Sequence, residues 1–147
     1  MISAVQIAQI GCGLFFLTGL LTGLWKYRCM MRSPDAQAPA YVDICHRTAL
    51  MYSFACLVLA EFAGLSRFPA PINQAAVLVP VLFFASAVAT YAVHGWLRDT
   101  DNQLRRPHVL GQHQLPGGLI RAYMTLLIVG EVGGFLVLFA GYLQGLG

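Results

Sequence analysis

Two histidines and two tyrosines are the side chains of this chain best suited to chemistry. His46 precedes Tyr52 by six residues and Tyr91 precedes His94 by three, each pair in an otherwise apolar stretch. Imidazole transfers protons and binds metals, and a phenol donates and accepts hydrogen bonds. Such groups are costly inside a bilayer, so they indicate a site if a membrane surrounds them. The alternative is that each is a hydrogen-bonded structural residue.

The composition indicates that a membrane does surround them. Hydrophobic residues make up 58% of the 147 residues and charged residues 10%, where a soluble domain carries about 25% charged. A soluble globular enzyme is therefore excluded. A spanning helix needs about 20 apolar residues and satisfies its own backbone hydrogen bonds, so the apolar runs predict an all-α bundle of four transmembrane helices. The predicted spans are 4–25, 40–66, 74–97 and 119–144.

The basic residues predict the orientation of the bundle. Eight of the nine lie in or beside the segments 26–39 and 98–118, and only Arg67 lies at the other end of the spans. By the positive-inside rule both segments are cytoplasmic loops and both termini lie outside, as in a multi-pass protein of a bacterial-type inner membrane. Lipid is then an expected partner, and nucleic acid is not, because no soluble basic face is present to bind it.

The second and third spans are expected to bring the four reactive side chains together. These spans run antiparallel, so His46, Tyr52, Tyr91 and His94 lie at similar depths in the cytoplasmic half of the bundle. Asp43 lies one turn before His46 and is expected to accept its Nδ1 proton, which leaves Nε2 free to bind a metal.

Haem fits these residue types better than zinc does. A zinc site needs three or four closely spaced ligands, whereas haem needs one axial imidazole, an apolar slot and cations near its propionates. A CxxCH attachment signature is absent, because Val42 stands three residues before Cys45, so the expected cofactor is non-covalent haem b. The cations expected near the propionates, which also have a topological explanation, are Lys26, Arg47, Arg105 and Arg106.

Several other features have both a structural and a functional interpretation. The GxxxG patterns at 19–23 and 130–134 predict close approach of helices. Glu61 and Glu131 lie at comparable depths in the outer half, where they form either a proton relay or two protonated, hydrogen-bonded carboxyls. The long loop 98–118 is either a lid over a cytoplasmic site or a solvated connector.

Three segments of the chain resemble the styrene oxide isomerase and hydroxylaminobenzene mutase family of small membrane isomerases. They are Gly19-Leu20-Leu21-Thr22-Gly23-Leu24-Trp25, the stretch from His46 to Tyr52, and Tyr91 with the loop after it. The resemblance runs from about Leu14 to Leu143. It implies a homotrimer that binds haem b, with His46 as the axial iron ligand and Tyr91 orienting the substrate oxygen. At the position of the family's asparagine this chain has Tyr52, which weakens the inference about substrate.

The resemblance implies an isomerase that rearranges a small apolar substrate taken from the bilayer, namely an epoxide or a hydroxylamine, by Lewis-acid chemistry at ferric iron without net redox change. An aromatic substrate is expected. The alternative is a non-enzymatic b-type haem protein for electron transfer or for gas or redox sensing. In that protein His94 or Tyr52 would be the second iron ligand and would leave no open site. A cofactor-free accessory subunit is a third interpretation.

Overall fold

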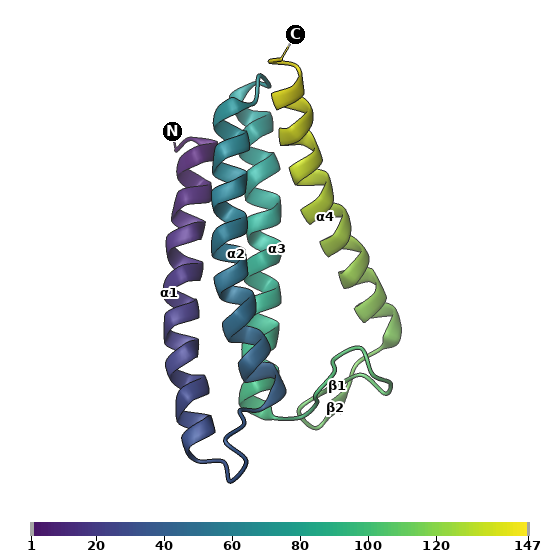
Figure 1. The fold of residues 1–147 in the computed structure, drawn as a ribbon. Helices are drawn as coiled ribbons and strands as arrows, with labels where there is room; N and C mark the ends of the chain where they lie inside the picture. The colour runs from purple at the N-terminus through teal and green to yellow at the C-terminus, as the bar shows by residue number, and fades with distance from the viewer. Residues whose placement is uncertain (1, 147) are drawn as a thin grey trace.

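A computed structural model describes residues 2–146 as four long helices with a small hairpin before the last of them (Figure 1). The helices are α1 (Ala4–Met31), α2 (Ala40–Leu65), α3 (Ala70–Leu97) and α4 (Gly117–Leu143), and the hairpin strands are β1 (Val109–Leu110) and β2 (His113–Gln114). All four helices are long and apolar enough to cross a membrane, which confirms the all-α, four-span prediction. Both termini lie at one end, and both basic loops at the other.

The helix ends follow from local sequence. Ser3 begins α1 with a capping box, in which its hydroxyl accepts from the Gln6 N–H and its own N–H donates to the Gln6 side chain. A proline is the N-cap of each of the other three helices, which suits its fixed φ and missing N–H. Helix α1 continues to Met31 rather than ending near residue 25, so Lys26 lies on the helix and not in a loop.

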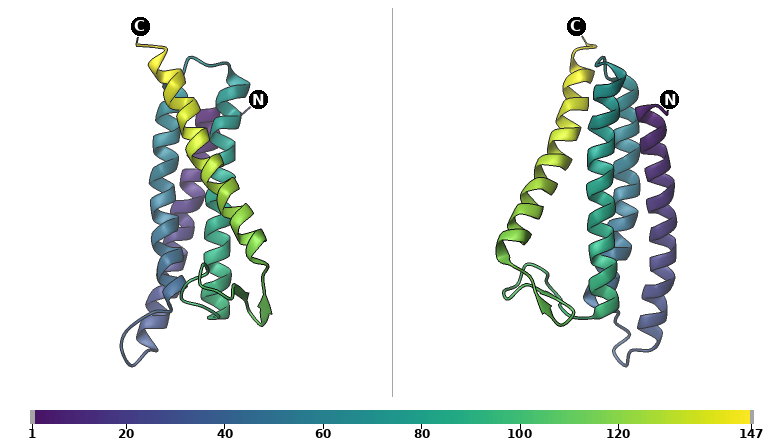
Figure 2. Two further views of the ribbon diagram at one scale, coloured as in Figure 1. Left: turned by 90° about the vertical axis from the view of Figure 1, so that its right-hand side faces the viewer. Right: turned by 180° about the vertical axis from the view of Figure 1, so that it is seen from behind.

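Glycines let the helices approach closely, as the GxxxG patterns predict. A Cβ on Gly19 would overlap the Leu50 side chain of α2, and a Cβ on Gly134 would overlap Pro80 of α3. Helices α1, α2 and α3 pack side by side along their lengths, whereas α4 crosses α3 at Gly130 and Gly134, in the middle of α4, and diverges from it toward the hairpin (Figures 1 and 2). The diverging ends of α3 and α4 form a wedge.

The hairpin lies at the open end of this wedge. Its strands pair antiparallel, Val109 with Gln114 and Leu110 with His113, and Gly111 turns the chain with a φ of 61° that favours glycine. Periodicity in the sequence predicted no strand here, because two-residue strands are too short to produce an alternating pattern. The connector 98–116 is therefore an ordered element that packs against the helices.

Candidate functional site

His46 is held in the interface between α1 and α2 by the first GxxxG pattern. Its Nδ1 lies 2.8 Å from the carbonyl oxygen of Gly19. A carbonyl oxygen only accepts, so Nδ1 carries the proton, and in the neutral ring Nε2 keeps a free lone pair. A Cβ on Gly23 would lie 2.9 Å from Cε1 of the ring, so this glycine leaves just enough room for the imidazole. The helix pair thus fixes both the position and the tautomer of His46.

The predicted hydrogen bond from His46 to Asp43 is wrong. Asp43 instead forms ion pairs with Lys26 of α1 and with Arg47, the latter at 2.9 Å. Two cations compete for the carboxylate, and α1 lies close enough for its backbone carbonyl to take the histidine proton. Sequence spacing identifies same-helix neighbours but not the carbonyls of a packed helix. The Nδ1 nitrogen of His46 nevertheless carries the proton, as the sequence analysis predicts.

The side chain of Tyr52 projects from a different side of α2 than the side chain of His46 does. Six residues correspond to roughly 120° around the helix axis. The Tyr52 ring stacks on Phe84 of α3 with centroids 4.0 Å apart, and its hydroxyl donates to Oε1 of Glu131 on α4 at 3.5 Å. Glu61, which the proton-relay interpretation would pair with Glu131, is exposed on α2 instead. Glu131 therefore has a tyrosine as its partner and not a second carboxyl.

Tyr91 joins the same polar region from α3. It is close enough to Tyr123 and Glu131 to interact with them electrostatically, and Tyr52 is a further neighbour of this kind. Tyr123 in turn shares a 2.8 Å hydrogen bond with Ser86. We call Tyr52, Tyr91, Tyr123 and Glu131 the tyrosine–carboxyl cluster; it lies where α2, α3 and α4 meet.

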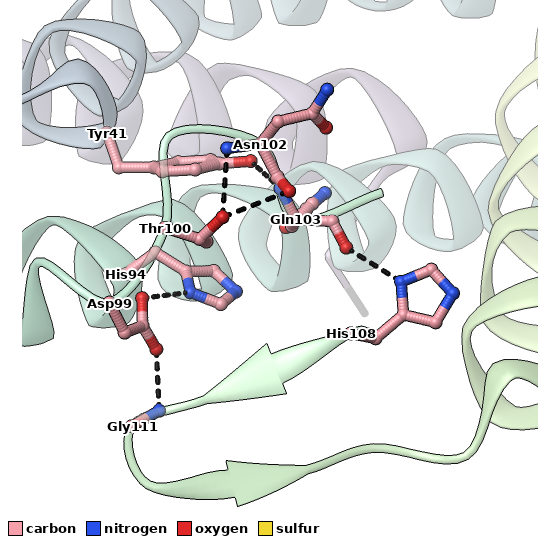
Figure 3. Close-up of polar contacts among 8 residues, drawn as sticks. All are labelled: Tyr41, His94, Asp99, Thr100, Asn102, Gln103, His108 and Gly111. Carbon is pink, nitrogen blue, oxygen red and sulfur yellow. Dashed lines mark hydrogen bonds and ion pairs between the residues drawn. The ribbon is translucent and has the colours of Figure 1, made fainter. Parts of the chain in front are cut away.

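His94 belongs to a separate arrangement next to the hairpin (Figure 3). Its Nδ1 lies 2.8 Å from Oδ1 of Asp99, and the other Asp99 oxygen accepts the Gly111 N–H at 2.6 Å. The side chains of this pair are only 4% and 5% exposed. Burial by itself raises the pKa of Asp99, but the hydrogen bonds from Gly111 and His94 outweigh it and hold that pKa below its usual range.

Tyr41 separates His94 from the tyrosine–carboxyl cluster. Its ring packs on His94 with centroids 5.0 Å apart and on Tyr91 at 5.7 Å, and its hydroxyl accepts the Gln103 N–H at 2.6 Å. The structure thus divides the four predicted side chains into three places: His46 against α1, the two tyrosines facing α4, and His94 next to the hairpin.

Only two of the four predicted propionate cations lie near His46. Lys26 and Arg47 flank it through their common partner Asp43. Arg105 pairs with Asp101 inside the connector at 2.9 Å, and Arg106 is exposed in the same segment. Both connector arginines therefore lie under the α3–α4 wedge.

Within residues 2–146 no group of three or more His, Cys, Asp or Glu side chains could hold a bare metal ion. A haem needs only one axial ligand from the protein, and His46 has a suitable nitrogen. No protein-family model, curated protein or solved structure matches the chain. We therefore infer function from the side chains together with the family resemblance of the sequence.

Proposed function

We propose that this chain is an intramembrane, haem-b-dependent isomerase that rearranges a small apolar epoxide or hydroxylamine. The observation that supports it best is the state of His46, whose Nδ1–H donates to the Gly19 carbonyl and leaves Nε2 as a metal-binding nitrogen. Metal-binding histidines commonly have this arrangement, in which a hydrogen bond at one nitrogen orients the other. The glycine cradle around the ring supports the same role.

The surroundings of His46 fit one wall of a haem slot. Residues at helical spacing from His46 on α2 and from Gly23 on α1 expose large apolar side chains, among them Phe54 at 62% and Leu20 at 54%. Lys26 and Arg47 lie at the basic end of this face, where propionates would lie. One chain provides only one wall, so a second wall comes from another copy.

A cyclic homotrimer, as the resemblance implies, resolves the separation of His46 from the tyrosines. In a ring each chain presents one flank to the next chain and the opposite flank to the previous one. His46 and Tyr52 lie on different flanks of α2, so the ring brings His46 of one copy toward the tyrosine–carboxyl cluster of its neighbour. We propose that the active site forms between copies.

The protein's own groups then orient the substrate and exclude water. Haem supplies, when bound, an open iron Lewis acid that withdraws electrons from the C–O or N–O bond. Tyr91 donates a hydrogen bond to the substrate oxygen, and Glu131 holds the Tyr52 hydroxyl in place beside it. The apolar walls exclude water from the electron-deficient centre while it rearranges. Because His94 is hydrogen-bonded to Asp99 next to the hairpin, His46 is the single protein ligand in this proposal.

Complementation between two inactive variants tests this proposal. His46→Ala removes the iron ligand and Tyr91→Phe removes the hydroxyl, so each variant alone should fail to convert styrene oxide or phenylhydroxylamine. In mixed trimers about one quarter of the interfaces combine an intact His46 with an intact Tyr91, so coexpression should restore about a quarter of wild-type turnover. Exposed His113 provides the control variant His113→Ala, which should retain full turnover. No restoration would contradict a site shared between copies, and turnover by His46→Ala alone would contradict the role of His46.

A further inference from the structure

A cavity of about 420 Å³ lies between α3, α4 and the hairpin, apart from His46 and its face. We call it the hairpin pocket. Its walls are mainly aliphatic, and it has no charged side chain among its lining residues, so it suits a neutral ligand. Its volume falls within the roughly 300–1,000 Å³ of small-molecule sites. The aliphatic lining includes Val93, Leu104, Val109, Leu115 and Leu119.

Most polar groups that line the pocket already have partners. Tyr123 bonds with Ser86, Thr90 donates to the backbone of the same helix, and Nδ1 of His108 bonds with the Gln103 carbonyl oxygen. These contacts leave three polar groups of interest among the lining residues: Nε2 of His94, Nε2 of His108 and the side-chain amide of Gln103.

His94 presents a hydrogen-bond acceptor to the hairpin pocket. The Asp99 carboxylate only accepts, so the bond between them places the proton on Nδ1. In the neutral ring Nε2 is then an acceptor, and Figure 3 shows it directed away from Asp99, toward the side where His108 lies. Asp99 is itself fixed by the Gly111 N–H of the hairpin. The hairpin therefore sets the tautomer that His94 offers to a ligand.

Gln103, which also lines the pocket, carries a buried acceptor without a partner in the described part of the chain. Its Oε1 is buried and has no hydrogen-bond partner within residues 2–146, the one such side-chain atom in that range. Buried acceptors without a partner are rare because they are costly, and they are satisfied when a ligand supplies a donor. The pocket thus combines the acceptor of His94 with an apolar body, and a buried amide oxygen without a partner in that range belongs to one of its lining residues.

We propose that the hairpin pocket binds a small neutral aromatic hydroxy compound of the phenol class. Its hydroxyl donates to Nε2 of His94, and its ring lies against the aliphatic side chains. This site is separate from the proposed haem site, and the inference does not rest on the proposed isomerase activity. A phenol reaches the pocket from the membrane interface, where such molecules partition.

Calorimetric titration of the full-length protein in nanodiscs, with empty nanodiscs subtracted, tests the proposal. The probes are phenol, which can donate, and anisole, its methyl ether, which only accepts. The wild-type protein should bind phenol at least tenfold more tightly than anisole. Asp99→Asn keeps the geometry but lets the amide donate to Nδ1, which moves the ring proton to Nε2, so the preference should reverse in favour of anisole.

Two further variants keep the result interpretable if Asp99→Asn disturbs the hairpin. Val93→Trp fills the pocket from α3 without touching the His94–Asp99 pair, so it should abolish binding of both probes. His113→Gln changes an exposed hairpin histidine and should leave both affinities unchanged. The proposal is overturned if the wild-type protein binds no phenol, if it does not prefer phenol to anisole, or if Val93→Trp binds phenol as the wild type does.

Discussion

Replacing Gly23 with alanine should displace His46 and weaken haem binding. The new Cβ would lie 2.9 Å from Cε1 and 3.1 Å from Nδ1 of the imidazole, closer than unstrained contacts allow. The ring cannot stay in place, and moving it breaks the 2.8 Å hydrogen bond to the Gly19 carbonyl. The substitution therefore displaces the proposed iron ligand without replacing any residue that would contact the haem.

The size of the effect follows from these contacts. Overpacking costs about 1–3 kcal/mol and the lost hydrogen bond about 0.5–1.5 kcal/mol. Alanine has a higher helix propensity than glycine, which offsets about 1 kcal/mol of this loss. The free energy of unfolding should therefore fall by roughly 0.5–3.5 kcal/mol. Disturbing the group that orients a metal ligand weakens metal binding roughly 10- to 100-fold, so haem affinity should fall by that factor.

Gly13→Ala is the matched control, because it lies on the same helix and a Cβ there would meet nothing within 4 Å. Haem titration followed at the Soret band, with thermal unfolding of the same samples, measures both effects. Gly13→Ala should bind haem as the wild type does and be no less stable. Gly23→Ala with wild-type haem affinity would refute the proposed link between the glycine cradle and the iron ligand.

Further predictions concern the other parts of the molecule. Tyr91→Phe should lower turnover of styrene oxide or phenylhydroxylamine roughly 10²- to 10³-fold, as loss of one oriented donor does, and leave the Soret band unchanged; unaltered turnover would remove Tyr91 from the mechanism. Because the pKa of Asp99 is lowered in the folded protein, its stabilisation of the hairpin is fully present above the ordinary aspartate pKa of about 4 and is lost as pH falls through the lowered value. NMR titration of the Gly111 amide should show this loss on acidification, and a pH-independent signal would contradict it. Gly134→Ala should destabilise the α3–α4 contact by about 1–3 kcal/mol in thermal unfolding, whereas Gly133→Ala, whose Cβ meets nothing within 4 Å, should not; equal stabilities would contradict the close approach.

The helices could be predicted from the sequence because their signals are local and repeated. Apolar runs locate all four spans, and glycine spacing correctly marks close helix contacts at 19–23 and 130–134. The residues at which the helices end were less predictable. Helix α1 extends to Met31 because Lys26 and Arg28, which follow the apolar run, are good helix formers. The helix therefore continues beyond the point at which the apolar run ends.

The arrangement of the candidate site could be predicted only in part, because side-chain direction depends on packing between helices. Similar depth suggested one cluster of His46, Tyr52, Tyr91 and His94, but the angular separation of the first two on α2 directs them to different neighbours. The hydrogen-bond partner of His46 is a backbone carbonyl, and residue types in a sequence do not indicate which backbone carbonyl a side chain will contact. Asp99 was not a candidate, although its spacing of five residues after His94 places it beyond the end of the same helix, where a side chain can fold back.

The absorption spectrum of the purified protein, produced with adequate haem supply, tests the central claim most directly. Wild-type protein and His113→Ala should show a Soret band, and His46→Ala should lose or shift it because the iron loses its only protein ligand. No Soret band in the wild-type protein, or an identical band in His46→Ala, would contradict the assignment of His46 as the haem ligand.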